Sequence, residues 1–283
     1  MKLKQLYILC FLLVLGTSCT NSYQKVLKST DLDFKLEKAK EYYNEGDYVK
    51  AIPLIEELIG LLKGNSQEVE KLYYFYPYCY YGQRDYEFAA FYFKNFMEYY
   101  PQSKYAEDAK FMIAYCYYRQ TPDVHLDQTN AYKTIESFQL FANAFPESER
   151  IERCNELIDK LRAKLELKAF NSAKLYFDMR DYKAAIAAFN NLGNDFPETE
   201  RLEEISFLIL EAYYEYAKKS IETKQVERYN QVTEQYLKHI EEFPESTNLR
   251  EAEKIYNNTL EALDVLENGV KTLTERLKEK AQL

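Results

Sequence analysis

The sequence predicts an all-α protein: an α-solenoid of about five helix–turn–helix repeats that ends in a C-terminal helix. Its 283 residues include only 7 Gly and 7 Pro, whereas average usage is about 7% Gly and 5% Pro. Sheets joined by tight turns and glycine-loop nucleotide folds need more of these residues. Hydrophobic residues make up 47% of the chain, enough for a large core. A pattern of aromatic, small and proline residues also recurs five times, which is typical of stacked helical repeats.

The first 19 residues have the features of a targeting segment. Lys2 and Lys4 precede an apolar run at positions 6–15, which is too short to span a bilayer, and small residues then lead to Cys19. This order resembles a bacterial lipoprotein signal, in which residues 1–18 are removed and Cys19 becomes the acylated first residue. The position three before the cysteine holds Gly instead of the usual Leu. An ordinary secretory signal with an incidental cysteine is the alternative.

Residues 19–32 are predicted to form a lipidated polar tether, and the repeats to follow over residues 33–247. Each repeat begins with one helix and continues with a second, patterned helix. The first helices are expected at residues 34–45, 69–82, 106–119, 151–179 and 202–219. The second helices carry the pattern at offsets of 0, 3, 7, 10, 14 and, except in the first copy, 15. The patterned residues are Tyr48, Ala51, Ile55, Leu58 and Leu62; Tyr86, Ala89, Phe93, Phe96, Tyr100 and Pro101; Ala131, Thr134, Phe138, Phe141, Phe145 and Pro146; Tyr182, Ala185, Phe189, Leu192, Phe196 and Pro197; and Tyr229, Val232, Tyr236, His239, Phe243 and Pro244.

These offsets place the patterned residues on one face of a helix. The small residue at offset 3 lets a neighbouring helix approach closely, and Pro at offset 15 ends the helix. The motif Gly46-Asp47-Tyr48-x-x-Ala51, with counterparts that begin at Asp85 and Asp181, resembles the tetratricopeptide repeat. Successive copies lie 38, 45, 51 and 47 residues apart, whereas that family repeats about every 34 residues. The excess is assigned to insertions, chiefly residues 121–130 and the long helix before the fourth copy.

Residues 248–283 are predicted to form a C-terminal capping helix and a tail. Leu249, Tyr256, Leu263, Val270 and Leu277 recur every seven residues, a spacing typical of a coiled-coil seam or a docking helix. We expect residues 249–267 to cover the last repeat. Asn-Gly at residues 268–269 predicts a break in the helix, followed by a segment that binds a partner or frays.

No catalytic or metal-binding motif is found in the sequence. The two histidines, His125 and His239, are far apart, and His239 occupies a core offset of the fifth repeat. Cys79, Cys116 and Cys154 lie in apolar helical stretches without metal-ligand spacing, so we expect small buried side chains there. Adjacent carboxylates on a helix point about 100° apart, unlike the facing pair of a glycosidase. The chain is therefore predicted to be no enzyme and to hold no metal or cofactor. Its net charge of −9 also argues against nucleic-acid binding.

Tyrosine-rich clusters occupy two of the predicted first helices. They lie at residues 73–81 and 115–118. Helical neighbours spread around the axis, so we expect part of each cluster in the core and the rest along a groove. An aromatic groove of this kind suits an extended apolar or aromatic peptide. Pro77 within the first cluster predicts a kink.

A lipid anchor followed by five widely spaced repeats resembles the BamD family, lipoproteins of the outer-membrane β-barrel assembly machine. The specific stretches are Asp127-Gln128 ahead of the third patterned helix, Phe145-Pro146 after it, and residues 161–166 in the long helix that follows. The fifth repeat and the heptad tail match that family less well.

The resemblance implies a non-enzymatic scaffold on the periplasmic side of the outer membrane, held in the bilayer by acyl chains on Cys19. Its implied partners are unfolded β-barrel precursors and the periplasmic domains of a BamA-like barrel protein. The second helix of the fourth repeat and the fifth repeat are then the expected docking surface. A tetratricopeptide adaptor for cell-wall synthesis or motility machinery is the alternative, and a glycan-capturing lipoprotein is a third class. The candidate groove residues are Tyr73, Tyr74, Tyr78, Tyr81 and Tyr117.

Overall fold

The computed structural model describes residues 22–62 and 67–281, with side-chain surroundings as far as residue 268. These described residues form helices and no strands, which confirms the all-α class. The chain divides into two compact units, Met1–Leu161 and Arg162–Leu283. The predicted signal at residues 1–18 and the lipidation site Cys19 lie outside the described residues.

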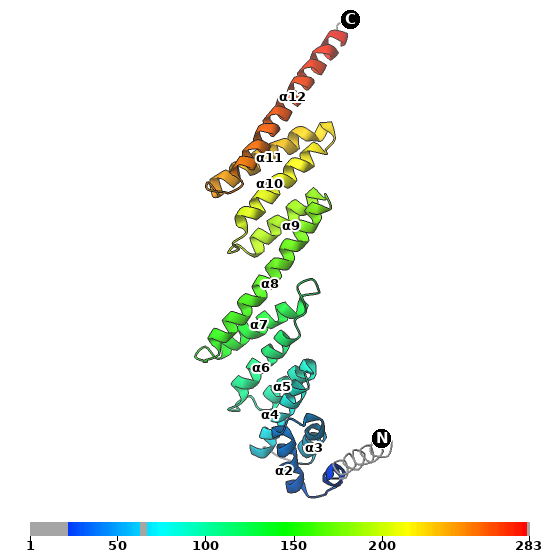
Figure 1. Cartoon of the computed structure of the whole chain (residues 1–283), viewed down its shortest axis with the longest axis vertical. Coiled ribbons are helices and arrows are strands. Elements are labelled where there is room, and N and C mark those ends of the chain that lie inside the picture. Colours follow the sequence, from blue (N-terminus) through cyan, green and yellow to red (C-terminus); the bar gives the residue numbers. More distant parts are fainter. Residues whose placement is uncertain (1–21, 63–66, 282–283) are drawn as a thin grey trace, which may run out of the picture. The chain divides into compact units, whose positions relative to one another are not determined.

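The first unit is built from helix pairs that follow the repeat pattern (Figure 1). A helical turn at residues 22–27 precedes the first pair. The pairs are α2 (Leu32–Asn44) with α3 (Tyr48–Leu61), α4 (Gln67–Gly82) with α5 (Tyr86–Tyr99), and α6 (Ala106–Arg119) with α7 (Thr129–Ala144). The first turns of α8 (Ile151–Asp178) close this unit, because Cys154 and Leu157 complete a core with Phe138 and Phe141.

The second unit continues the pattern from within α8. The later part of α8 packs on α9 (Tyr182–Asp195), with Phe170 and Ala173 buried in the shared core. α10 (Leu202–Lys218) then pairs with α11 (Glu222–Glu242). α12 (Leu249–Ala281) lies against both, and Ala252 and Ile255 are buried in that contact.

The recurring pattern forms the buried face of each second helix. Offset 3 is fully buried in every copy, and in three copies it is alanine, which lets the paired helix approach closely. Offsets 7 and 10 are buried as well, and they hold the largest core rings, such as Phe93, Phe138 and Phe189. Helices α5, α7, α9 and α11 each end two residues or fewer before the proline at offset 15, because proline cannot continue the backbone hydrogen bonds.

In the first, second and fourth repeats, the turn between the two helices is closed by backbone hydrogen bonds of the Schellman type. In the first repeat, Asp47 N–H donates to Tyr42 C=O at 2.8 Å and Gly46 N–H donates to Tyr43 C=O at 3.1 Å. Gly46 has φ +76°, and the residues at the same place in the second and fourth repeats, Arg84 and Arg180, have φ +64° and +65°. Glycine reaches this left-handed conformation without strain, whereas arginine does not.

Two helix interruptions were predicted, a break at residues 268–269 and a kink at Pro77. The predicted break at residues 268–269 is wrong, since α12 runs unbroken from Leu249 to Ala281. A helical glycine costs only about 1 kcal/mol, and strong helix formers on both sides continue the hydrogen bonds. α4 likewise continues through Pro77, which is buried. The kink expected there stays a prediction.

Candidate functional site

Hollows occur at equivalent places between consecutive repeats. Each lies between the second helices of two repeats and is floored by the first helix between them. The tyrosine hollow, about 220 Å³, is lined by Glu56, Ile59, Tyr73, Tyr76, Tyr92, Asn95 and Tyr99. The lysine hollow, about 430 Å³, is lined by Lys94, Lys110, Ile113, Tyr117, Lys133, Glu136, Ser137 and Leu140. The C-terminal hollow, about 380 Å³, lies between α9 and α11 over α10 in the second unit.

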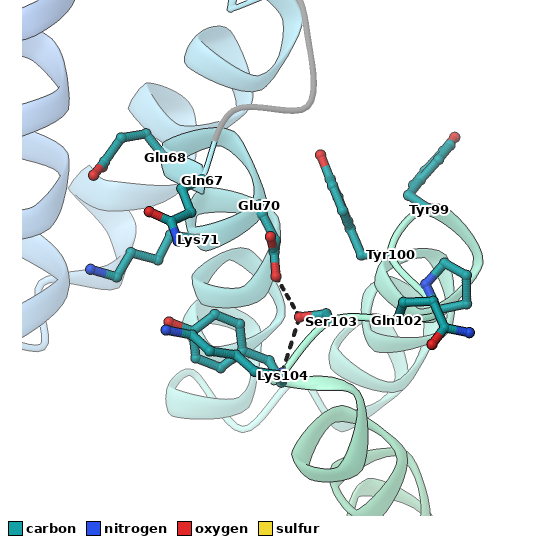
Figure 2. Close-up of a pocket in the computed structure, with 11 residues that line it drawn as sticks. Gln67, Glu68, Glu70, Lys71, Tyr99, Tyr100, Gln102, Ser103 and Lys104 are labelled. Atoms are coloured by element: carbon teal, nitrogen blue, oxygen red, sulfur yellow. Dashed lines mark hydrogen bonds between the residues drawn. The ribbon is translucent and has the colours of Figure 1, made fainter.

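A larger pocket of about 500 Å³ lies at the end of the second repeat, and we call it the turn pocket. The first turn of α4 and the turn from α5 to α6 line it. Figure 2 shows Tyr99 and Tyr100 on the opposite side of this pocket from Glu68 and Lys71. Glu68 is held by Lys40 of α2 at 2.5 Å, and this hydrogen bond lowers the pKa of Glu68. The pocket thus combines exposed rings with polar side chains that are held in place.

The turn pocket and the tyrosine hollow share Tyr99, and together we call them the tyrosine trough. Tyr73 joins the two halves, because its ring centroid lies 5.5 Å from that of Tyr99 and 5.6 Å from that of Tyr100. Tyr99 is 65% exposed. A ring so exposed, next to other rings, offers an apolar surface with hydroxyl groups at its edge.

An aromatic cluster supports the wall of the trough. Tyr92 contacts Tyr76 with ring centroids 4.5 Å apart and stacks on Tyr80 at 5.1 Å. Burial raises the pKa of Tyr76 far above its ordinary value, so its hydroxyl stays protonated. Phe88 and Phe91 extend the cluster outward and are 50% and 54% exposed. This cluster widens the apolar surface next to the trough.

The five tyrosines predicted to line one groove are found in four different surroundings. Tyr73 lies in the trough, and Tyr117 lies in the floor of the lysine hollow. Tyr81 is half-buried beside α6, where Arg119 donates a hydrogen bond to its hydroxyl at 3.3 Å. The groove role of all five stays a prediction, but they do not form one continuous surface.

Tyr74 and Tyr78 point toward a carboxylate between α4 and α6. Both hydroxyls donate to Asp108, Tyr74 at 2.7 Å. Arg150 also pairs with Asp108, at 2.5 Å. Burial, followed by hydrogen bonding with neighbouring side chains, raises the pKa of Tyr78, and burial raises that of Tyr74. Tyr74 also stacks on Tyr105 with centroids 4.2 Å apart. These contacts hold two repeats together and occupy both hydroxyls.

Sequence reasoning missed two tyrosines that line the trough from a second helix. Tyr92 and Tyr99 occupy offsets 6 and 13 of the pattern, one residue before core offsets 7 and 14. The second copy alone has aromatic residues at both offsets. That difference between copies was the available signal. The three lysines of the lysine hollow had no such signal, because three helices contribute one each.

The expected docking surface includes the C-terminal hollow. Asn190 and Gly193 of α9 face Gln235 and Lys238 of α11 across it. His239 is buried near this hollow, with its Nδ1 3.1 Å from Ser206 Oγ. Burial lowers the pKa of His239, so the ring is neutral around pH 7. It therefore packs as a core side chain.

Other features of the described residues concern metals, thiols and membranes. No group of three or more metal-ligating side chains is found among them. Cys79, Cys116 and Cys154 are free and fully buried, and burial raises the thiol pKa of Cys79 to about 12. Across the described chain, none of the helices is both long and apolar enough to cross a membrane.

Comparison with known proteins yields a family match and one curated relative. The model of the YfiO family, described as an outer membrane lipoprotein family, matches residues 35–229. A putative outer membrane protein assembly factor BamD from Aquifex aeolicus (strain VF5) is 29% identical over 248 residues. That alignment covers 87% of this chain and 77% of the relative. The family match extends from the first unit into the second.

Among solved structures, helical repeat domains are similar in part. The tetratricopeptide domain of P58(IPK) is 13% identical, with a TM-score of 0.39 over 91% of this chain and 68% of that one. The TPR2AB domain of yeast Sti1, in its pHSP90 complex, is 16% identical, with a TM-score of 0.37 over 81% of this chain and 98% of that one. With scores this low, the fold class rests on the helix pairs themselves.

Proposed function

Because the chain belongs to the YfiO (BamD) family of outer-membrane lipoproteins, we propose that it is a non-enzymatic scaffold of the outer-membrane protein assembly complex. It binds unfolded β-barrel precursors and the periplasmic domains of a BamA-type barrel protein, for folding and insertion of the precursors. It sits on the periplasmic side of the outer membrane and is anchored by acyl chains on Cys19.

The tyrosine trough is the proposed binding site for precursor segments. The observation that carries this assignment is the ring pair of Tyr73 and Tyr99, 5.5 Å apart, with Tyr92 lining the same hollow and Tyr99 65% exposed. Strands of a β-barrel carry apolar and aromatic side chains on their lipid-facing side. In an unfolded precursor these side chains seek an apolar surface, and tyrosine rings bind them with little loss of side-chain entropy.

The second unit is the proposed dock for the barrel partner. The C-terminal hollow combines an apolar floor of Ile205 and Ile209 with polar rims on α9 and α11. An apolar centre inside a polar rim is the usual composition of a protein–protein interface. A partner domain with a protruding apolar side chain fits this arrangement.

A binding experiment tests the trough. The probe is a fluorescent peptide that corresponds to the aromatic carboxy-terminal strand of a barrel protein. We expect the double change Tyr92→Ala and Tyr99→Ala to weaken binding about tenfold, or 1.4 kcal/mol, since two stacking surfaces are lost. Tyr132→Ala is the matched control, because Tyr132 is 63% exposed on α7 and lines none of the hollows named above. Equal affinities for the two variants, with both helical by circular dichroism, would remove the trough from the proposal.

Purification in mild detergent from the native membrane tests the complex itself. We expect a barrel protein with periplasmic domains to co-elute at near-equal amounts. Cell-wall synthesis or motility proteins in its place would favour the adaptor function and contradict barrel assembly.

A further inference from the structure

We propose that the lysine hollow is a docking site for an acidic segment of a partner protein, in which two carboxylate side chains flank an apolar one. The hollow lies between α5, α6 and α7, and none of its lining residues belongs to the tyrosine trough. This inference therefore stands or falls separately from the proposed function.

The local charge of the hollow is opposite to that of the chain. Lys94, Lys110 and Lys133 come from three successive helices, and Glu136 is the only carboxylate among the lining residues. Three positive charges and one negative charge leave +2 at this place, in a chain whose net charge is −9. Because the rest of the surface repels a long polyanion, the hollow favours a short segment with two negative charges.

The three ammonium groups are not neutralised inside the described part of the chain. None of them has a carboxylate within 4.0 Å there, whereas Lys35 and Lys40 each pair with a glutamate of another helix. Lys94 lies over the ring of Tyr117, with Nζ 5.2 Å from the ring centroid. This contact holds the Lys94 side chain over the floor of the hollow and does not neutralise its positive charge.

The floor of the hollow is apolar and accessible. Ile113 and Tyr117 of α6 are half-buried, and Leu140 of α7 is 52% exposed. The volume of about 430 Å³ is in the range of pockets that bind small ligands. An apolar side chain can cover this floor while carboxylates on either side of it reach the lysines. Charged groups arranged in this way give specificity and speed association.

The test uses the full chain and an end-capped fluorescent peptide centred on Glu-Leu-Glu, with binding measured by fluorescence anisotropy at low salt. We expect the wild type to bind this peptide and to bind a Gln-Leu-Gln peptide at least tenfold more weakly. The double change Lys110→Gln and Lys133→Gln should weaken binding of the acidic peptide about tenfold, or 1.4 kcal/mol. Added salt should weaken wild-type binding, since the charges are partly exposed.

Lys183→Gln is the control, because Lys183 is an exposed lysine of α9 in the other unit. It should leave affinity unchanged. Lys133→Glu is a second variant at the same exposed position and should weaken binding further than Lys133→Gln does. The proposal is overturned if the wild type does not prefer the acidic peptide, or if the double variant binds it as the wild type does. Equal binding of an uncharged peptide with a free carboxy-terminus would also overturn it, in favour of a terminal-carboxylate site.

Discussion

Ser103 Oγ donates a hydrogen bond to Glu70 at 2.5 Å and accepts one from the backbone N–H of Tyr105 at 3.0 Å (Figure 2). This pair ties the turn after the second helix of a repeat to the first helix of the same repeat. Three further repeats contain the same arrangement: Ser148 with Glu107, Thr199 with Glu166, and Ser246 with Glu203, at 2.6, 2.5 and 2.7 Å. The hydroxyl lies two residues after the proline in each copy.

Thr199→Val tests how much this turn contributes to stability. Thr199 is only 6% exposed, and valine keeps its shape but loses the bonds to Glu166 and to the N–H of Arg201. We expect the free energy of unfolding to fall by about 1–2 kcal/mol, because two polar groups lose their partner. Urea unfolding measures the change. Thr223→Val at an exposed position of α11 is the control, and an equal effect there would assign the loss to hydroxyl removal in general.

Gly60 and Gly82 are both helical, and alanine should have opposite effects at the two. A Cβ on Gly60 meets nothing within 4 Å, so Gly60→Ala should stabilise by about 0.5–1 kcal/mol. A Cβ on Gly82 would lie 1.9 Å from the Tyr48 ring, so Gly82→Ala should destabilise by about 1 kcal/mol or more. In a Tyr48→Ala background the same change should become stabilising. A loss in both backgrounds would mean that the ring is not the cause.

Arg180→Gly should stabilise the protein, although it removes a side chain. Arg180 has φ +65° at the turn between α8 and α9. A left-handed residue with a Cβ costs about 1–2 kcal/mol. Glycine removes this strain, but it also makes the unfolded chain more flexible, which cancels about half of the gain. We expect a net gain of about 0.5–1 kcal/mol in urea unfolding. Arg153→Gly in the exposed face of α8 is the control and should lose about 1 kcal/mol, so a loss at both sites contradicts the explanation.

Acidification should weaken the α10–α11 pair through His239. Burial lowers its pKa, and the charges of Glu203 and Glu242 oppose this only in part. An unfolded histidine titrates near pH 6.5, so the unfolded state takes up a proton at a higher pH than the folded state. The contribution of His239 to the free energy of unfolding is therefore fully present above about pH 6.5. It decreases as the pH falls from there toward the lower pKa of the folded state.

Urea midpoints at pH 7.5, 6.5 and 5.5 measure this effect, with His239→Gln as the comparison. We expect the wild-type midpoint to fall more steeply over this range than that of the variant. The hydrogen bonds of Glu203 lower its pKa below 4.5. The contribution of Glu203 to stability is therefore lost only below the pH range of this experiment, and it does not mask the effect of His239. Parallel midpoints would show that His239 does not titrate in this range.

The fold was largely predictable because it repeats. The pattern of Tyr182, Ala185, Phe189 and Leu192 places one face of α9 in the core whatever the neighbouring repeats do, since helix periodicity acts locally. The ends of α5, α7, α9 and α11 were predictable for the same reason, as proline acts on its own turn. The break at residues 268–269 was mispredicted, because a glycine ends a helix only where the chain takes a left-handed turn.

The site was less predictable because it depends on distances between repeats. Helix positions, core faces and the family are readable from the chain alone, because they depend on residues close in the chain or on whole-chain similarity. The packing of the repeats was needed to show that Tyr74 and Tyr78 donate their hydroxyls to Asp108, thirty or more residues away, while Tyr99 stays exposed. It likewise gathered lysines of three helices around Tyr117. Periodicity predicts the direction in which a side chain points from its own helix. Which residue that side chain contacts depends on how the neighbouring helices pack.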